Sequence, residues 1–154
     1  MVKSMKTVEV SQNVLDGFIK LPAATVFNAV SSLGSPRCVM QGVRTFTPGN
    51  RMAARARTLR FLPMRPDLID INPAGEGSAE YEAMSRCGPG DALVADMMNM
   101  RWSAVGGDVK LVQLQMNNAD GIVCDGAIRD RDVVVEEDYG LAIYAQDRTI
   151  LGGD

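Results

Sequence analysis

The spacing in this chain that is most suggestive of chemistry is an aspartate, twenty other residues, and then an adjacent arginine and aspartate. Asp108 follows two glycines at the predicted start of a helix, and Arg129 and Asp130 follow an apolar strand at residues 121–125. The free N–H groups of a helix N-terminus attract anions, and loops after the strands of α/β units collect functional side chains. We therefore expect these groups to meet in one crevice, which suits a small oxo-acid held against a divalent metal.

Several elements must position these side chains. Hydrophobic periodicity predicts helices at residues 12–20, 23–33, 79–84 and 109–117 and strands at residues 42–46, 51–59, 92–95, 121–125 and 141–145. Ser11 is the expected cap of the first helix. Val109, Val112 and Met116 share one face of the helix at 109–117, which we expect to be buried. The alternation of helix and strand in the second half predicts an α/β fold with a partly parallel sheet and flanking helices.

Composition excludes several functional classes. The chain has 154 residues, 46% of them hydrophobic and 23% charged, as in an ordinary globular protein. A net charge of −3 gives no electrostatic case for a nucleic-acid partner. No apolar run is long enough to span a bilayer, and residues 1–10 lack the order of a signal peptide. Five arginines cluster in one stretch, and this cluster predicts either a solvated strand face or a subunit contact. They are Arg51, Arg55, Arg57, Arg60 and Arg65.

The cysteine and histidine counts narrow the chemistry further. Cys38, Cys87 and Cys124 are odd in number and unpatterned, which indicates reduced, buried thiols of a cytoplasmic protein. The sequence contains no histidine, so a Ser-His-Asp triad and a histidine-ligated zinc site are excluded.

At residues 21–145 the chain resembles the family that contains the regulator of ribonuclease activity A and the 4-hydroxy-4-methyl-2-oxoglutarate aldolases. The resemblance lies in the Pro-Gly-Asp before residues 93–96, in the Gly-Gly-Asp ending at Asp108, and in residues 121–130. It implies a β/β/α swivelling-domain fold, a homotrimer or a hexamer, and a single domain over residues 1–154 with an N-terminal helix in residues 1–20. Older naming called such chains demethylmenaquinone methyltransferases, but this sequence has no apparent methyl-donor loop.

The resemblance also implies the role of each residue. Members of the aldolase branch carry an aspartate, twenty residues and then Arg-Asp, which Asp108, Arg129 and Asp130 match. We expect Asp130 to bind Mg²⁺ or Mn²⁺, Arg129 to hold the oxygens of the oxo-acid, and Asp108 to orient or activate a water for proton transfer. The backbone N–H groups near Gly107, Asp108 and Val109 are expected to receive the substrate carboxylate.

Three departures from the family pattern keep other interpretations open. The family continues for several strands beyond the equivalent of Ala145, so this chain is C-terminally short, and a neighbouring subunit's acid from that region has no counterpart here. Val133 stands where the family has an acid. The loop after Asp96 contains Met97, Met98 and Met100 in place of glycines, and we expect these methionines to fill the core and Trp102 to pack or line a pocket.

The function that follows is a metal-dependent lyase that releases pyruvate from 4-hydroxy-2-oxo acids, from oxaloacetate, or from both. One alternative is a non-catalytic protein that binds and regulates a ribonuclease. Another is an inactive fragment of a longer aldolase. In structural terms, Arg129 and Asp130 can also cap the next helix or pair across a subunit contact, and Asp108 can simply complement the helix dipole.

Overall fold

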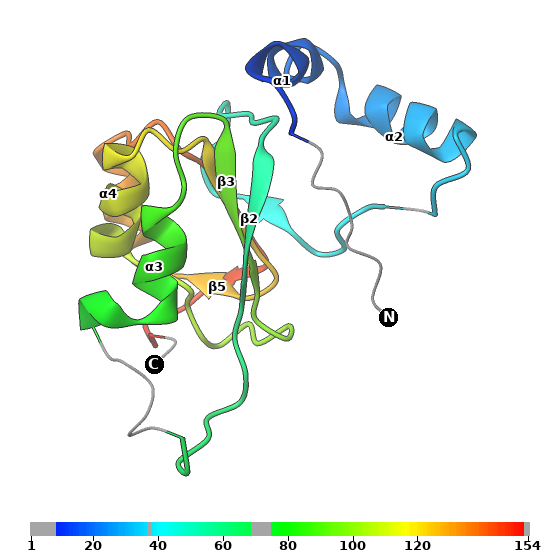
Figure 1. Ribbon diagram of the computed structural model, residues 1–154. Helices are drawn as coiled ribbons and strands as arrows, with labels where there is room; N and C mark the ends of the chain where they lie inside the picture. The colour runs from blue at the N-terminus through cyan, green and yellow to red at the C-terminus, as the bar shows by residue number, and fades with distance from the viewer. Residues whose placement is uncertain (1–8, 37, 69–74, 153–154) are drawn as a thin grey trace. The chain divides into compact units, whose positions relative to one another are not determined.

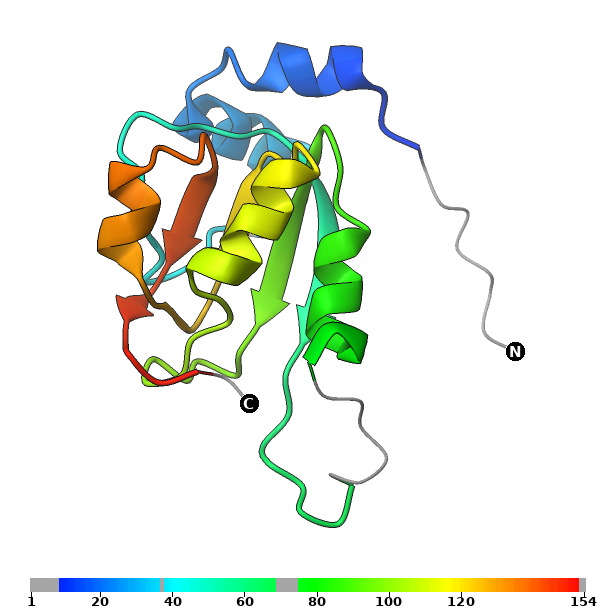
Figure 2. The ribbon, with the colours of Figure 1, turned by 90° about the vertical axis from the view of Figure 1, so that its left-hand side faces the viewer.

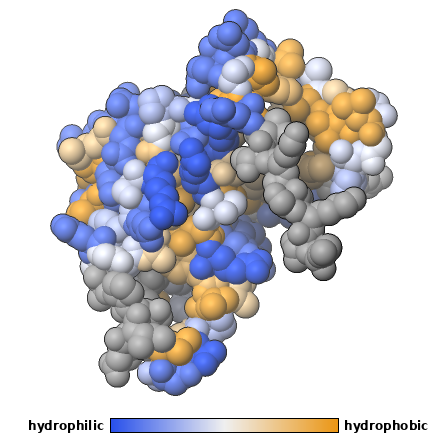
Figure 3. All heavy atoms as spheres, in the orientation of Figure 1, coloured by the Kyte–Doolittle hydropathy of each residue, from blue (hydrophilic) through white to orange (hydrophobic). Residues whose placement is uncertain are grey.

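The structure is a computed structural model that describes residues 9–36, 38–68 and 75–152, so the first eight residues of the predicted N-terminal segment lie outside it (Figure 1). The chain divides into two compact units, residues 1–38 and 39–154. The first contains α1 (Gln12–Phe18) and α2 (Ala23–Ser32), close to the predicted ranges. Ser11 precedes α1 but makes no capping bond with its side chain. Apolar surface remains on this unit, at Val14, Phe18, Leu21 and Leu33 (Figure 3).

The second unit is built on a five-stranded sheet in the order β1-β6-β4-β3-β2. The strands are β1 (Arg44–Thr45), β2 (Arg55–Arg60), β3 (Asp91–Asp96), β4 (Gly121–Cys124) and β6 (Ala142–Ala145). Strands β2, β3, β4 and β6 are parallel, and β1 pairs with β6 in the antiparallel sense. The predicted partly parallel sheet is confirmed.

Three helices cover one face of this sheet: α3 (Ala79–Ser85), α4 (Asp108–Met116) and α5 (Arg131–Glu136) (Figure 2). Side chains alternate across a strand, so every second residue of β3, β4 and β6 points toward the helices. Leu93, Ile122 and Ile143 are completely buried there. Burying a side chain of this size contributes about 1.5–3 kcal/mol, so this layer supplies much of the driving force for folding.

The buried face of α4 differs from the predicted one. Leu111 and Leu114 are completely buried, whereas Val109 and Met116 are 65% and 75% exposed. Both sets of apolar residues fit a helical period, and periodicity alone does not say which of two stripes meets the sheet. Lys110, which lies between Val109 and Leu111 in the sequence, forms an ion pair with Glu80 of α3. The prediction that Val109, Val112 and Met116 form the buried stripe was therefore wrong.

Several smaller predictions also need correction. β2 begins at Arg55 rather than at residue 51. Two strands that were not predicted, β5 (Ala127–Ile128) and β7 (Asp147–Arg148), form a second sheet. Cys38 is exposed, while Cys87 and Cys124 are buried as expected. Of the residues expected to be packed, Met97 is fully buried, but Met98 and Trp102 are 51% and 62% exposed.

The arginines of β2 find acidic partners on the neighbouring strand. Arg55 and Arg57 donate to the two carboxylate oxygens of Asp91 at 2.8 and 3.0 Å, and Arg60 donates to Asp96 at 2.7 Å. In the parallel register Arg55 lies opposite Asp91 and Arg60 opposite Asp96. The charged edge strand is thus tied into the sheet by ion pairs within the chain. No helix in the described ranges has the length and apolar character needed to cross a membrane.

Candidate functional site

The candidate site is formed by the two segments that leave the carboxyl ends of β3 and β4. Hydrogen bonds join these segments in sequence: Ala127 N donates to Ser103 O at 3.1 Å, Val105 N to Ala127 O at 3.0 Å, and Arg129 N to Gly106 O at 3.1 Å. The last bond of this series is between Asp108 N and Asp130 Oδ2, at 3.3 Å. All the residues singled out from the sequence, Gly107, Asp108, Val109, Arg129 and Asp130, are therefore brought to one place.

Gly107 is the residue around which this arrangement closes. It is the buried N-cap of α4. A Cβ atom at this position would overlap Asp130 Oδ2 and would lie 2.7 Å from Arg129 Nε. No side chain fits in that space without displacing the Arg-Asp pair. Gly107 thus allows the two segments to approach, and the second glycine of the Gly-Gly-Asp motif has a steric explanation.

The Arg129–Asp130 pair is loose and half-exposed. Arg129 Nε lies 3.3 Å from Asp130 Oδ2, and the two side chains are 43% and 38% exposed. Asp130 precedes α5 with a left-handed backbone (φ 54°), yet its side chain makes no capping bond to that helix. The simple capping interpretation therefore does not describe this carboxylate, which turns toward α4 instead. The left-handed conformation costs roughly 1–2 kcal/mol in an ordinary residue, though aspartate tolerates it better than most.

The N-terminus of α4 already carries carboxylates from the chain itself. Asp130 accepts from Asp108 N, and Asp108 Oδ1 accepts from Val109 N at 2.7 Å. Two of the N–H groups predicted to receive a substrate carboxylate are thus bonded within the protein. To reach these two N–H groups, a bound acid would have to displace one of the carboxylates; otherwise it can bind through the guanidinium of Arg129.

The donor set fits a hard divalent cation bound mainly through water and ligand. Asp130 and Asp108 supply carboxylate oxygens, which Mg²⁺ and Mn²⁺ prefer. Across the described residues no group of three or more His, Cys, Asp or Glu side chains is placed to hold a metal. An ion here would therefore have one or two protein ligands, which is the usual mode for Mg²⁺ and not for structural zinc.

Tyr139 is a further residue near the site that the sequence analysis did not identify. Its pKa is raised, first because of burial and then because of the negative charges of Asp108, Glu137 and Asp130. Its ring packs against the hydrophobic core. Nothing in the sequence marks it, because it lies beyond α5 and returns to the site only through the fold.

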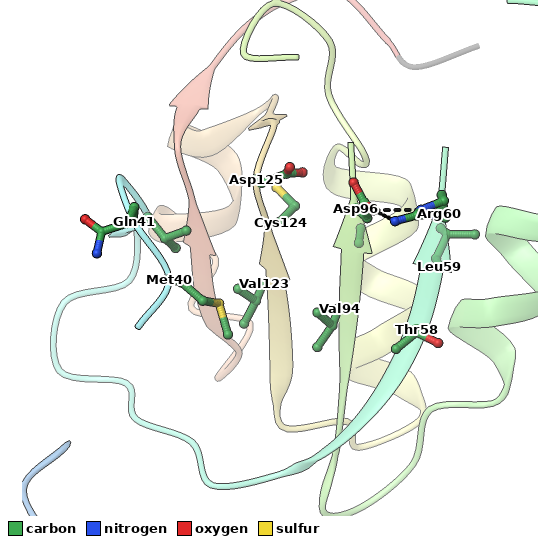
Figure 4. A pocket seen from close by; sticks show the side chains of 12 residues that line it. Met40, Gln41, Thr58, Leu59, Arg60, Val94, Asp96, Val123, Cys124 and Asp125 are labelled. Atoms are coloured by element: carbon green, nitrogen blue, oxygen red, sulfur yellow. Dashed lines mark hydrogen bonds and ion pairs between the residues drawn. The ribbon is translucent and has the colours of Figure 1, made fainter. Parts of the chain in front are cut away.

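Two hollows lie elsewhere in the second unit. One, of about 650 Å³, lies on the sheet face away from the helices and is lined by Met40, Thr58, Val94 and Val123, with polar side chains at the strand ends (Figure 4). The other, of about 570 Å³, lies beside α3 and α4. Neither is lined by the residues of the candidate site.

The fold and this site define a mixed α/β protein with a mostly parallel sheet. Its Gly-Gly-Asp and Arg-Asp segments meet at the carboxyl ends of two adjacent strands. Residues 23–152 match the family model RraA-like, described as Aldolase/RraA. The chain belongs to this family. Comparison with curated proteins gives no match.

Solved structures share this fold. An uncharacterized protein from Pseudomonas syringae pv. tomato is 22% identical over 99% of this chain, with a TM-score of 0.79. RraAS2 of Streptomyces coelicolor, described as an unusual member of the RNase ES inhibitor RraA family, is 25% identical over 94%, with a TM-score of 0.80. RraA of Thermus thermophilis, described as an RNA-processing inhibitor, is 19% identical over 86%, with a TM-score of 0.61. The chain spans 64%, 68% and 71% of these three proteins.

Proposed function

We propose that this protein is a divalent-metal-dependent lyase that releases pyruvate from 4-hydroxy-2-oxo acids, from oxaloacetate, or from both. The observation that supports this most strongly is the meeting of Asp108 with Arg129 and Asp130 around a glycine that has no room for a side chain. The three residues come from two segments far apart in sequence, and they match the spacing that the resemblance to the aldolase branch implies.

The chemistry requires the bond between C3 and C4 of the oxo-acid to break, leaving its electron pair on the pyruvate fragment as an enolate. Asp130, with Asp108 beside it, would hold Mg²⁺ or Mn²⁺, which when bound stabilises developing negative charge by several kcal/mol. Arg129 would bind the oxygens of the oxo-acid, since each charge-assisted hydrogen bond contributes about 1.5–3 kcal/mol. In the aldol cleavage Asp108 would exchange protons through a water, accepting one from the C4 hydroxyl and returning one to C3. In the decarboxylation of oxaloacetate the C4 carboxylate would leave as CO2, and the water would supply the proton that C3 takes up.

The direct test is detection of pyruvate from oxaloacetate and from 4-hydroxy-4-methyl-2-oxoglutarate, with Mg²⁺ or Mn²⁺ and then with a chelator. We expect metal-stimulated turnover that the chelator stops. Arg129→Ala should lower kcat/KM by about 10–1,000-fold, and Asp108→Asn by about 10²–10⁴-fold. A wild-type protein without metal-stimulated turnover on either substrate would overturn the proposal.

A second candidate is a non-catalytic regulator of a ribonuclease. The observation that favours it is the description of one structural relative as an RNA-processing inhibitor and of another as an unusual member of the RNase ES inhibitor RraA family. Under this function, the protein would slow cleavage by a ribonuclease, and Asp130→Ala would leave that inhibition intact. We also propose a homotrimer or hexamer, which light scattering at micromolar concentration tests.

A further inference from the structure

The loop that follows β3 has an unusual backbone. Met98 and Asn99 are successive residues in the left-handed region, with φ of 53° and 60°. An asparagine tolerates this conformation, whereas a methionine does so rarely, so other contacts must hold the loop in place. The side chain of Met98 is 51% exposed, so its own packing is a weak source of that stabilisation.

Carboxylates supply those contacts. Asp125 Oδ1 accepts from Met97 N at 2.5 Å, Asp125 Oδ2 accepts from Asn99 N at 2.8 Å, and Asp96 Oδ1 accepts from Met98 N at 3.0 Å. Three successive N–H groups thus donate to two aspartates. Asp125 uses both of its oxygens, so one side chain holds Met97, directly before the strained pair, and Asn99, the second residue of that pair.

Asp125 also stands at the start of the segment that carries Arg129 and Asp130. Its own N–H donates to Ala95 O at 3.4 Å. The next residue, Gly126, lies so close to the buried Met97 that a Cβ would be 2.7 Å from Met97 Cβ. From this point the hydrogen bonds between the two segments continue through Ala127 and Arg129 to the bond between Asp108 N and Asp130.

We propose that Asp125 is a positioning residue, whose carboxylate locks the loop at residues 97–99 onto the β4 end and thereby sets the register in which Gly107 and Asp108 meet Arg129 and Asp130. It touches neither the metal site nor a substrate position. Its effect passes through the series of backbone bonds between the two segments. The inference rests on the proposed function for its readouts of activity and Mn²⁺ affinity, whereas its hydrogen-exchange readout is independent of that function.

The chain offers a matched control at the opposite end of the same strand. Asp120 precedes β4, and its Oδ1 accepts from Gly90 N at 2.9 Å. Like Asp125, it is an aspartate at one end of β4 whose carboxylate accepts a hydrogen bond from a backbone N–H of a neighbouring loop. Unlike Asp125, it lies at the amino ends of the strands. Its loss should lower stability without disturbing the candidate site.

The experiment compares Asp125→Ala, Asp125→Asn, Asp120→Ala and the wild type by amide hydrogen exchange and by Mn²⁺ titration under conditions where all four are folded. Outer contacts of metal sites typically change affinity by about 10–100-fold, and we expect a loss of this size in Asp125→Ala. We also expect faster exchange at the amides of Val105, Asp108 and Arg129. Asp125→Asn keeps one acceptor oxygen, so its Mn²⁺ affinity and exchange rates should fall between those of the wild type and of Asp125→Ala. It replaces Asp125→Ala if that variant does not fold.

The result that overturns the proposal is an Asp125 variant that behaves like Asp120→Ala, with lower global stability but unchanged Mn²⁺ affinity and unchanged exchange at these three amides. Pyruvate release is measured in parallel. If the wild type binds Mn²⁺ but releases no pyruvate, the proposed function fails while the exchange data still decide the role of Asp125. If the wild type binds no Mn²⁺, exchange at the three amides decides it alone.

Discussion

The molecule uses arginine and aspartate together in two very different settings. At the amino end of β3, Asp91 is 5% exposed and receives Arg55, Arg57 and the N–H of Gly88. At the candidate site, Asp130 is 38% exposed, and its nearest guanidinium atom, Arg129 Nε, is 3.3 Å away. The residue types are the same, but the first carboxylate receives short bonds from two arginines, at 2.8 and 3.0 Å, whereas the contacts of the second are both 3.3 Å long.

The difference separates a structural ion pair from one that can serve a ligand. A buried carboxylate with several donors is costly to unpair, so its contribution appears as stability. A half-exposed carboxylate with a long contact gives up little when it exchanges a partner for a metal or a substrate. Substitutions at the two places should therefore separate stability from function.

The largest effect is expected from Asp130→Asn. Asparagine tolerates the left-handed backbone at this position and keeps an acceptor for Asp108 N, but it removes the negative charge. Because a bound metal stabilises the transition state by several kcal/mol, we expect pyruvate release to fall by about 10³-fold or more. The midpoint of urea unfolding should hardly change, since the carboxylate is half-exposed. Full metal-stimulated turnover in the variant would show that Asp130 is not the metal ligand.

The second effect tests the geometry and not the charge. In Gly107→Ala the new Cβ would displace Asp130 and Arg129, and a displacement of about 1 Å can cost about 10²-fold in rate, which we expect in kcat/KM. Gly106→Ala is the control, because a Cβ there meets Lys110 Cβ at 3.5 Å and Met84 Cε at 3.7 Å, which are ordinary contacts. Equal kinetics in the two variants would mean that the close approach at Gly107 has no part in catalysis.

The sequence predicted the elements around the site more accurately than it predicted their contacts. The start of α4 and the strand before Arg129 were both predictable, because a glycine pair followed by a periodic run and an apolar run before a turn are local signals. The hydrogen bonds between the segments that leave β3 and β4 were not, since they depend on the pairing of strands far apart in sequence. The close approach of Arg129 and Asp130 to Gly107 was likewise not predictable, because it depends on the same pairing of distant strands.

The same limit explains the misassigned face of α4 and the missed aspartates. A short helix with two apolar stripes can bury either one, and the sequence alone does not say which. Packing against the sheet buries the stripe with Leu111 and Leu114. The sequence marks Asp125 only as the last residue of a strand, because its two side-chain bonds go to a loop whose uncommon backbone conformation has no local signal. Asp91 belonged to the matched motif, but its arginine partners lie about 35 residues away and become neighbours only in the parallel register of β2 and β3.

The third effect is on stability. Burial alone raises the pKa of Asp91, but hydrogen bonds from Arg55, Arg57 and Gly88 outweigh it, so the pKa lies below its usual value. We expect Asp91→Asn to lower the free energy of unfolding by about 1–3 kcal/mol at pH 7. The folded pKa is depressed, so this contribution is present above the unfolded pKa of about 3.9 and is lost as the pH falls through the folded value. Urea unfolding of both proteins between pH 7 and pH 3 should show their difference shrinking below about pH 4.

The smallest effect is expected at another arginine–aspartate pair, which lies on an exposed segment. Arg65 donates to Asp67 through Nε at 2.7 Å and through an Nη atom at 2.5 Å, and both side chains are more than half exposed. The hydrogen bond from Arg65 lowers the pKa of Asp67. Geometry here is better than at Arg129–Asp130, yet water and salt screen the pair, so Asp67→Asn should not move the urea midpoint measurably. Carboxyl titration by NMR should show the pKa of Asp67 returning toward its usual value in about 1 M salt, while that of Asp91 stays low. If both carboxylates responded to salt alike, burial would not be what distinguishes the arginine–aspartate pairs of this protein.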